Sequence, residues 1–339
     1  MRGRLGLFRT GHYRGRQLPF GYVAAVETPY VRRAEPDELR LAASHLEELA
    51  DAAQAYVVDE SVLVADGSVA AEERADSRYD GKWGLGSEMV CIEVVPRVAA
   101  IADHLRGLAA LTGTPGVSLS ISSLVRPTLE ALATLSWLYE DGIGGRERIR
   151  RRFNLRLVSL AQEENLANML GKSDGRFQRT IDDIATGADN HGFRFNAPTT
   201  TKRGIVHPGR LGPPVPTGEA LITRLAAPAS QTIDVGGLVY RRTSAVVHGQ
   251  MHGFHPFLLS DTPSTVPGAL RAEFGLPFAW FCILTSSVLG ALNASMWRVL
   301  EHYGRNPDDW ADVSQAAIDQ WVAWLAETNT FESTSDPRH

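Results

Sequence analysis

The stretch that most restricts the fold of this chain is residues 274–296, which contains no charged side chain. A run of this length either crosses a membrane or forms a helix that is packed on every side inside a protein. Pro277 and Asn293 lower its hydrophobicity, as do the polar residues at 285–287. We therefore predict a buried central helix rather than a membrane span.

Most of the remaining sequence carries helical spacing of apolar residues. We find no alternating strand pattern, no βαβ rhythm, no phosphate loop or dinucleotide fingerprint and no internal repeat. Helices are expected over approximately 36–53, 87–111, 117–140, 146–170, 176–186, 219–225, 234–251, 266–303 (with Pro277 as a candidate break) and 308–328. The predicted fold is all-α, a multi-helix bundle.

Composition divides the chain into segments. We expect an irregular basic arm at 1–35, a helical extension at 36–86, the bundle at 87–328 and a disordered tail at 329–339. Within the bundle, a stretch rich in proline, glycine and threonine at about 187–218 predicts a long irregular insertion. The helices expected to form the core of the bundle are those that carry Arg126, residues 146–170, Arg241 to His248 and the uncharged run.

The overall charge and the cysteines limit the possible functions. The net charge of −5 over 339 residues means that nucleic-acid binding would need a local basic patch. Cys91 and Cys282, the only cysteines, lie in apolar surroundings and are expected to be reduced core residues. No apolar signal core follows the basic start, so we expect a cytoplasmic protein with no membrane partner.

The segment from Tyr240 to Gly249 holds the strongest functional signal. At about 100° per residue, Arg241, Ser244 and His248 fall on one stripe of a helix, with Arg242 to the side. A guanidinium suits a phosphate, and a nearby imidazole in a partly buried cleft suits proton transfer. The alternative is a structural network in which His248 binds a backbone carbonyl and the arginines pair with acids.

These residues resemble a known motif. The spacing of Arg241 or Arg242 to His248 resembles the Arg-x(4–6)-His motif of the HEPN superfamily, all-α bundles common in bacterial toxin and phage-defence systems. The wider pattern, Tyr240, Ser244 and His248 followed by Gly249, resembles an uncharacterised HEPN-like branch that also carries an Arg-x3-Glu pair on an earlier helix. Arg126 and Glu130 match that pair, and the resemblance covers about residues 90–300.

The resemblance implies a metal-independent endoribonuclease that uses no cofactor. His248 would act as general acid and base, and Arg242 or Arg241 would stabilise the charge on the pentacoordinate phosphate. It also implies RNA as substrate and a homodimer with two such motifs at its interface. Two alternatives remain: a non-catalytic HEPN-like binding or scaffold protein, and a small-molecule enzyme that uses a helical cavity with the 187–218 segment as lid.

Two other groups of charged residues are candidates for supporting roles. We expect Glu130 to pair with an arginine of the 240s helix and orient it, although a plain ion pair with Arg126 is the alternative. Six arginines between residues 146 and 156 form a local basic patch. The members predicted to bind phosphate or another anion are Arg148, Arg151 and Arg152. The alternative is a solvated surface paired with the acids at 163/164 and 182/183.

The histidines are not expected to bind a metal. His248, His252 and His255 are spaced four and three residues apart, but no acid or cysteine lies between them. We expect His252 and His255 in a loop after the helix, and His191 and His207 facing solvent in the insertion.

Overall fold

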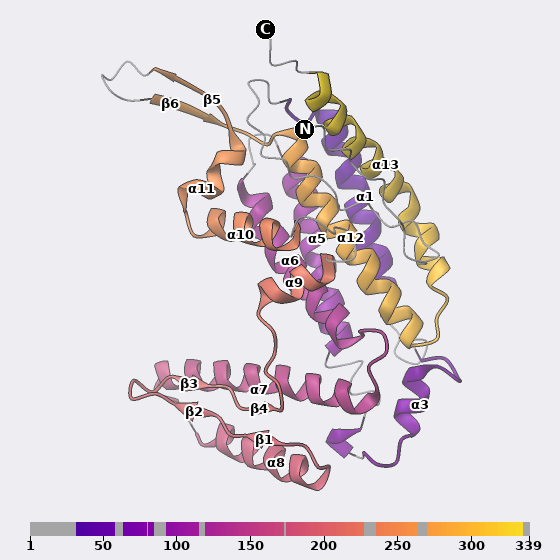
Figure 1. Cartoon of the computed structure of the whole chain (residues 1–339), viewed down its shortest axis with the longest axis vertical. Coiled ribbons are helices and arrows are strands. Elements are labelled where there is room, and N and C mark those ends of the chain that lie inside the picture. The colour runs from indigo at the N-terminus through magenta and orange to yellow at the C-terminus, as the bar shows by residue number, and fades with distance from the viewer. Residues whose placement is uncertain are drawn as a thin grey trace, which may run out of the picture.

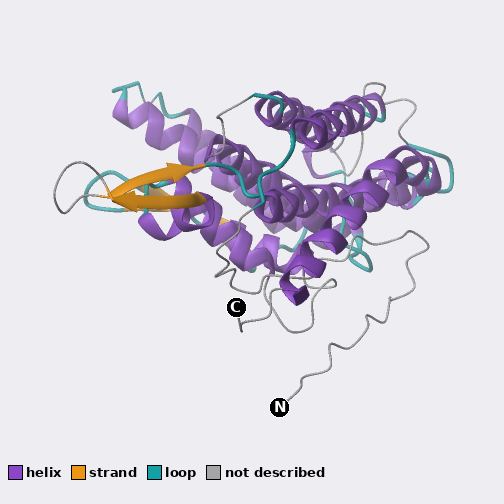
Figure 2. Cartoon of the chain, turned by 90° about the horizontal axis from the view of Figure 1, so that it is seen from above, coloured by secondary structure: helices purple, strands orange, loops and turns teal. Residues whose placement is uncertain are grey.

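In a computed structural model of the chain, the structure describes residues 32–57, 64–79, 81–84, 93–114, 119–172, 174–226, 235–263 and 270–334. Most of these residues are helical, as Figure 2 shows. The named strands form three short antiparallel pairs. The predicted all-α, multi-helix fold is therefore confirmed. Residues 1–31 of the expected basic arm, and Cys91, lie outside the described residues.

Five long helices run lengthwise as a bundle (Figure 1): α1 (Pro36–Ala55), α5 (Val95–Thr112), α6 (Leu119–Leu138), α12 (Phe278–His302) and α13 (Pro307–Thr334). α12 packs between α6 and α13, and most of its side chains are buried. It is the one described helix that is long and apolar enough to cross a membrane, but 78% of its most apolar stretch is buried inside the protein. The expected buried central helix is what the structure shows.

The start of α1 follows from local sequence. Glu35 and Glu38 form a reciprocal capping box, and Pro36 occupies the first turn, where its missing N–H costs nothing. The buried face of α1 packs against α5 and α13. Residues 36–55, expected as part of an extension, are thus members of the bundle. At the other terminus α13 continues to Thr334, beyond the predicted end at 328.

The helix predicted over 266–303 is wrong in its first part. Residues Leu270–Phe274 form strand β6, which pairs with β5 (Leu258–Pro263), and α12 begins only after Pro277. Apolar and charged residues alternate from Leu270 to Phe274, which is a strand pattern. A proline also restricts the residue before it to extended backbone, so a helix cannot easily continue through Leu276.

Shorter helices cover one side of the bundle. α9 (Gly218–Ala226) and α10 (Val235–Val247) both pack on α6, and α10 is followed by α11 (Met251–Phe254) and a 3-10 turn, His255–Phe257. These helices carry the Arg/His motif. Figure 1 shows them beside the middle and upper part of α6, below the β5–β6 hairpin.

A second layer crosses the lower end of the bundle. It consists of α7 (Gly145–Met169) and α8 (Arg176–Asn190), joined to the bundle through α3 (Val69–Ala75) and the 3-10 turn Gly81–Trp83 (Figure 1). We had expected the arginine-rich helix α7 in the core of the bundle, but it lies in this second layer instead. Trp83 fastens the layer: its ring stacks on Phe153 of α7 at a centroid distance of 4.0 Å.

The insertion expected at 187–218 is more regular than predicted. α8 runs to Asn190, and a hairpin ribbon follows, made of β1 (Phe195–Asn196) with β4 (Arg210–Leu211) and β2 (Thr199–Thr200) with β3 (Val206–His207). Two asparagines of α7 bind the backbone of the ribbon. Each side-chain amide donates to a carbonyl and accepts from an N–H, as the backbone of a neighbouring strand would. Asn165 exchanges two hydrogen bonds with the backbone of Val206 (2.7 and 3.0 Å), and Asn154 binds Leu211 in the same way (2.6 and 3.1 Å).

Candidate functional site

A polar cluster joins α6 to α10. The guanidinium of Arg126 donates from Nη1 to Ser244 Oγ (3.1 Å), from Nη2 to the hydroxyl of Tyr240 (3.3 Å) and from Nε to Glu130 Oε1 (3.1 Å). It also lies 4.9 Å from the centre of the Tyr240 ring. We call these four residues the α6–α10 cluster. The cluster is partly buried: the Arg126 side chain is 23% exposed.

The fourth member, Glu130, faces the start of another helix. A β-carbon placed on Gly218, the first residue of α9, would lie 3.1 Å from Glu130 Oε1. The absence of a side chain at Gly218 lets the carboxylate approach the amino end of α9, where the helix dipole favours negative charge. The cluster thus holds α6, α9 and α10 together.

His248 lies one helical turn beyond Ser244. Its N–H donates to the carbonyl of Ser244 (3.0 Å), and Gly249, with φ of +66°, ends the helix. Tyr240, Ser244 and His248 are four residues apart, so they share one stripe that begins at the Arg126 fork. The ring of His248 is exposed to solvent, whereas we had expected a partly buried cleft.

The two motif arginines have other partners. Arg241 forms an ion pair with Glu219 of α9 (Nε to Oε1, 2.6 Å) and keeps 74% of its side chain exposed. Arg242 donates to the carbonyl of His252. The prediction that Glu130 orients one of these arginines is therefore wrong, because Glu130 pairs with Arg126 on its own helix. Among the arginines named from the sequence, it is Arg126 that contacts Tyr240 and Ser244.

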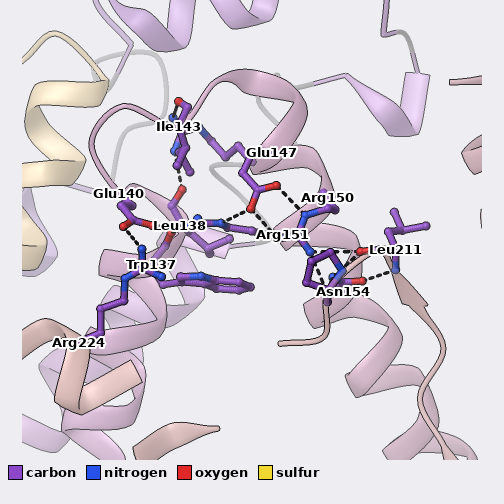
Figure 3. Close-up of polar contacts among 12 residues, drawn as sticks. Trp137, Leu138, Glu140, Ile143, Glu147, Arg150, Arg151, Asn154, Leu211 and Arg224 are labelled. Carbon is purple, nitrogen blue, oxygen red and sulfur yellow. Dashed lines mark hydrogen bonds and ion pairs between the residues drawn. The ribbon is translucent and has the colours of Figure 1, made fainter. Parts of the chain in front are cut away.

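The arginines predicted to bind phosphate are buried instead. Arg148, Arg151 and Arg152 are each 6% exposed or less. Arg148 donates to the carbonyl of Leu138. Arg151, labelled in Figure 3, donates to the carbonyl of Trp137. The last carbonyls of α6 have no partner within the helix, so these two guanidinium groups cap its carboxyl end. Arg152 donates to the carbonyl of Gly84 (3.2 Å).

Acids inside the fold neutralise this charge. Arg151 pairs with Glu140 (2.7 Å) and Glu147 (2.8 Å), as Figure 3 shows, and Arg148 pairs with Glu73 (3.1 Å). Buried charges need such partners. Of the acids that we expected at 163/164 and 182/183, Glu163 pairs with Arg156 (2.7 Å) on the surface. The arginine run of α7 therefore forms a joint that connects the crosswise layer to the bundle. The sequence feature that indicates this role is the position of the run directly after the turn that ends α6.

Sequence reasoning missed a buried cluster at the same joint. Glu73 Oε2 lies 3.6 Å from Nε2 of His302, and the hydroxyls of Tyr139 and Tyr303 are hydrogen-bonded at 2.9 Å. Burial lowers the pKa of His302 to about 3, an effect to which the positive charge of Arg148 adds. Burial raises the pKa of Glu73, against the opposite effect of Arg148. The cluster comes from segments far apart in the chain, so no local motif indicates it.

We expect His302 to make the fold sensitive to mild acid. Since its pKa falls from an ordinary value of 6.5 to about 3 on folding, the unfolded chain binds more protons between these values. Stability is therefore lost as pH falls through this window, and at pH 5 the cost is about 2 kcal/mol. Denaturant titrations at pH 7 and pH 5 measure it.

The matched comparison for this prediction is His302→Gln. Glu73 gives the opposite slope, because an acid whose pKa is raised on folding favours the folded state as it gains its proton. The difference between the two proteins isolates the histidine, and we expect the variant to lose less stability between pH 7 and pH 5. Equal losses would contradict the assignment.

Other potential sites have less support. Among the described residues, no group of three or more His, Cys, Asp or Glu side chains is placed to hold a metal. His252 lies in α11 and His255 begins the following 3-10 turn. Cys282 is a free, buried cysteine, and burial raises the pKa of its thiol. An apolar pocket between α6, α9, α10 and α12 is lined by residues such as Leu129, Ile222 and Val239, and His248 is not among them.

No protein-family model, curated protein or solved structure matches this chain.

Proposed function

We propose that this chain is a HEPN-like, metal-independent endoribonuclease whose site is the exposed edge of the α6–α10 cluster. The observation that supports this best is the reach of Arg126 from α6 to Ser244 and Tyr240, on the stripe that ends in the exposed His248. The arginine of the site is then Arg126 rather than Arg241 or Arg242. A toxin or phage-defence role, as in the proteins that the motif resembles, belongs to the same proposal.

The chemistry requires a base and a cation beside one phosphodiester. The imidazole of His248 takes the proton from a ribose 2′-hydroxyl, and the 2′-oxygen attacks phosphorus while the bond to the 5′-oxygen breaks. The leaving oxygen takes up a proton, which gives a 2′,3′-cyclic phosphate and a 5′-hydroxyl. The planar fork of Arg126 suits the charge that develops on the phosphate. Arg241, which is exposed on the same side of α10 as His248, supplies a second cation for the RNA backbone.

The proposal includes a homodimer in the cytoplasm. His248 is exposed at the edge of the α6–α10 cluster. RNA bound there by one copy therefore contacts solvent on the side that faces away from the protein. A second copy placed against α10 would exclude that water, which strengthens the electrostatic contribution of the arginine. Val247 and Met251, which flank His248, are exposed apolar residues and give such a contact apolar area.

The decisive experiment incubates the purified chain with single-stranded RNA in EDTA. We expect cleavage that leaves 2′,3′-cyclic phosphate and 5′-hydroxyl ends, identified by mass spectrometry of the products. RNA that stays intact in every buffer, or cleavage that requires an added divalent cation, would refute the proposal.

A second candidate is a non-catalytic HEPN-like scaffold or RNA-binding protein. One observation favours it: the fork of Arg126 already has three partners within the cluster, and Arg242 is used by a main-chain carbonyl. In that case the cluster serves only to fix α10 on α6. The same incubation separates the two, since a scaffold leaves the RNA uncut. The third alternative, a small-molecule enzyme, is not favoured, because the ribbon expected as its lid packs on α7.

A further inference from the structure

The free end of the crosswise layer exposes a group of aliphatic side chains. Leu166, Met169 and Leu170 are three and four residues apart at the carboxyl end of α7, so they share one face. Met169 is 84% exposed, and the other two are 58% and 60% exposed. Ile205 of the adjoining ribbon is 50% exposed, next to Val206, which Asn165 binds. We call these four residues the tip patch, and Figure 1 shows its elements at the end of α7 that bears β2 and β3.

Positive charge surrounds the tip patch. The exposed cations at this end of the layer are Lys172, Arg176, Arg179, Lys202 and Arg203. The acid in the turn between α7 and α8 is Asp174, whose Oδ1 accepts a hydrogen bond from the backbone N–H of Arg176 (2.9 Å), and the nearest acids on either side are Glu164 of α7 and Asp182 of α8. Cations therefore outnumber acids within residues 165–181 and 199–207, in a chain whose net charge is −5. Cations around apolar side chains complement an anionic surface with an apolar interior.

The local backbone holds this arrangement in place. Gly171, with φ of +63°, ends α7, and the N–H of Lys172 donates to the carbonyl of Ala167 (2.8 Å). The N–H of Gly171 donates to the carbonyl of Asn168 (3.1 Å), which completes a Schellman motif. Lys172 is thereby fixed beside Met169 and Leu170. Because the backbone under the patch is held by these hydrogen bonds, little backbone conformational entropy opposes its insertion into a surface.

We propose that the tip patch is a peripheral docking site for an anionic lipid bilayer, which replaces the expectation from the sequence that the chain has no membrane partner. Its aliphatic side chains enter the boundary between headgroups and acyl chains, and the surrounding cations contact the lipid phosphates and carboxylates. RNA is the other large anion to consider, but exposed aliphatic side chains offer no stacking platform for bases, so the lipid surface fits better. This inference is independent of the catalytic proposal, since it involves no residue of the α6–α10 cluster.

The test is co-sedimentation of the full chain with vesicles of phosphatidylcholine, alone or mixed with phosphatidylserine. We expect binding to the mixed vesicles that weakens as salt is added. The double variant Lys202→Gln, Arg203→Gln should lower the partition coefficient roughly thirty-fold, on the basis of the usual contribution of each basic residue. The double variant Met169→Gln, Leu170→Gln should reduce binding to the level seen with neutral vesicles.

Matched controls come from the bundle. Val313→Gln removes an exposed apolar side chain from α13, and Arg40→Gln removes an exposed cation from α1, so both should bind as the parent chain does. Equal sedimentation with neutral and anionic vesicles, or tip variants that bind like the controls, would overturn the proposal. So would binding of single-stranded RNA that the Lys202/Arg203 variant loses while its vesicle binding is unchanged, because that result assigns the surface to RNA.

Discussion

Arg148→Met is expected to lower the free energy of unfolding by about 3–5 kcal/mol, the usual cost of removing one partner from a buried ion pair. The substitution leaves the carboxylate of Glu73, itself 10% exposed, without its guanidinium. It also removes the hydrogen bonds to the carbonyls of Leu138 and Ile143, so the end of α6 loses its cap. Methionine fills much of the same space, which limits the effect of a cavity. Urea denaturation followed by circular dichroism measures the change.

Arg156→Met is the matched control for Arg148→Met. Both arginines lie on α7 and pair with a glutamate, but Arg156 and Glu163 are 42% and 60% exposed. An exposed pair of this kind contributes at most about 1 kcal/mol. If Arg148→Met cost no more than this control, the buried joint would not stabilise the fold. Adding Glu73→Gln to Arg148→Met should recover part of the loss, because it removes the unpaired charge.

This joint also shows what the sequence could not reveal. The spacing of apolar residues predicted α1, α6 and α7 to within a few residues, because a helix that buries one face must repeat that face every three to four positions. Where each helix lies depends on contacts between residues far apart in the chain. A run of arginines looks the same whether it faces solvent or, as Arg148 does, caps a helix ten residues earlier.

Strands were harder to predict than helices for a related reason. The ribbon strands β1 to β4 are two residues each, too short for alternation to be visible. Their stability comes from Asn154 and Asn165 on a different element. β6 is long enough to show alternation, but the apolar run that begins at Phe274 made it look like the start of a longer helix.

The candidate site was predicted in part. Sequence named Arg126, Glu130, Tyr240, Ser244 and His248, and the structure brings the first four into hydrogen-bonding contact, with His248 one turn away. The pairing could not be predicted, because it depends on how α10 is rotated about its axis relative to α6. A rotation of one residue position, about 100°, would have turned Arg241 rather than the Tyr240–Ser244 stripe toward α6.

The second large effect is expected at His248. If the proposed ribonuclease activity is correct, His248→Ala should lower the rate of RNA cleavage by about 10²–10⁴-fold, the usual contribution of a general acid–base group. His248 is exposed and lies directly after the last residue of α10. The variant should therefore melt at the same temperature as the parent chain. His207→Ala is the matched control, because His207 is also an exposed histidine and lies in the ribbon, away from the cluster.

Substitution of Arg126 tests the same site independently of His248. Arg126→Lys keeps the positive charge but loses the fork that reaches Ser244, Tyr240 and Glu130 together. A catalytic arginine predicts slower cleavage while His248 remains in place. Cleavage that survives both His248→Ala and Arg126→Lys would place the activity elsewhere in the chain. A rate loss in Arg126→Lys together with an unchanged rate in His248→Ala would mean that the cluster positions α10 and that the imidazole is not the base.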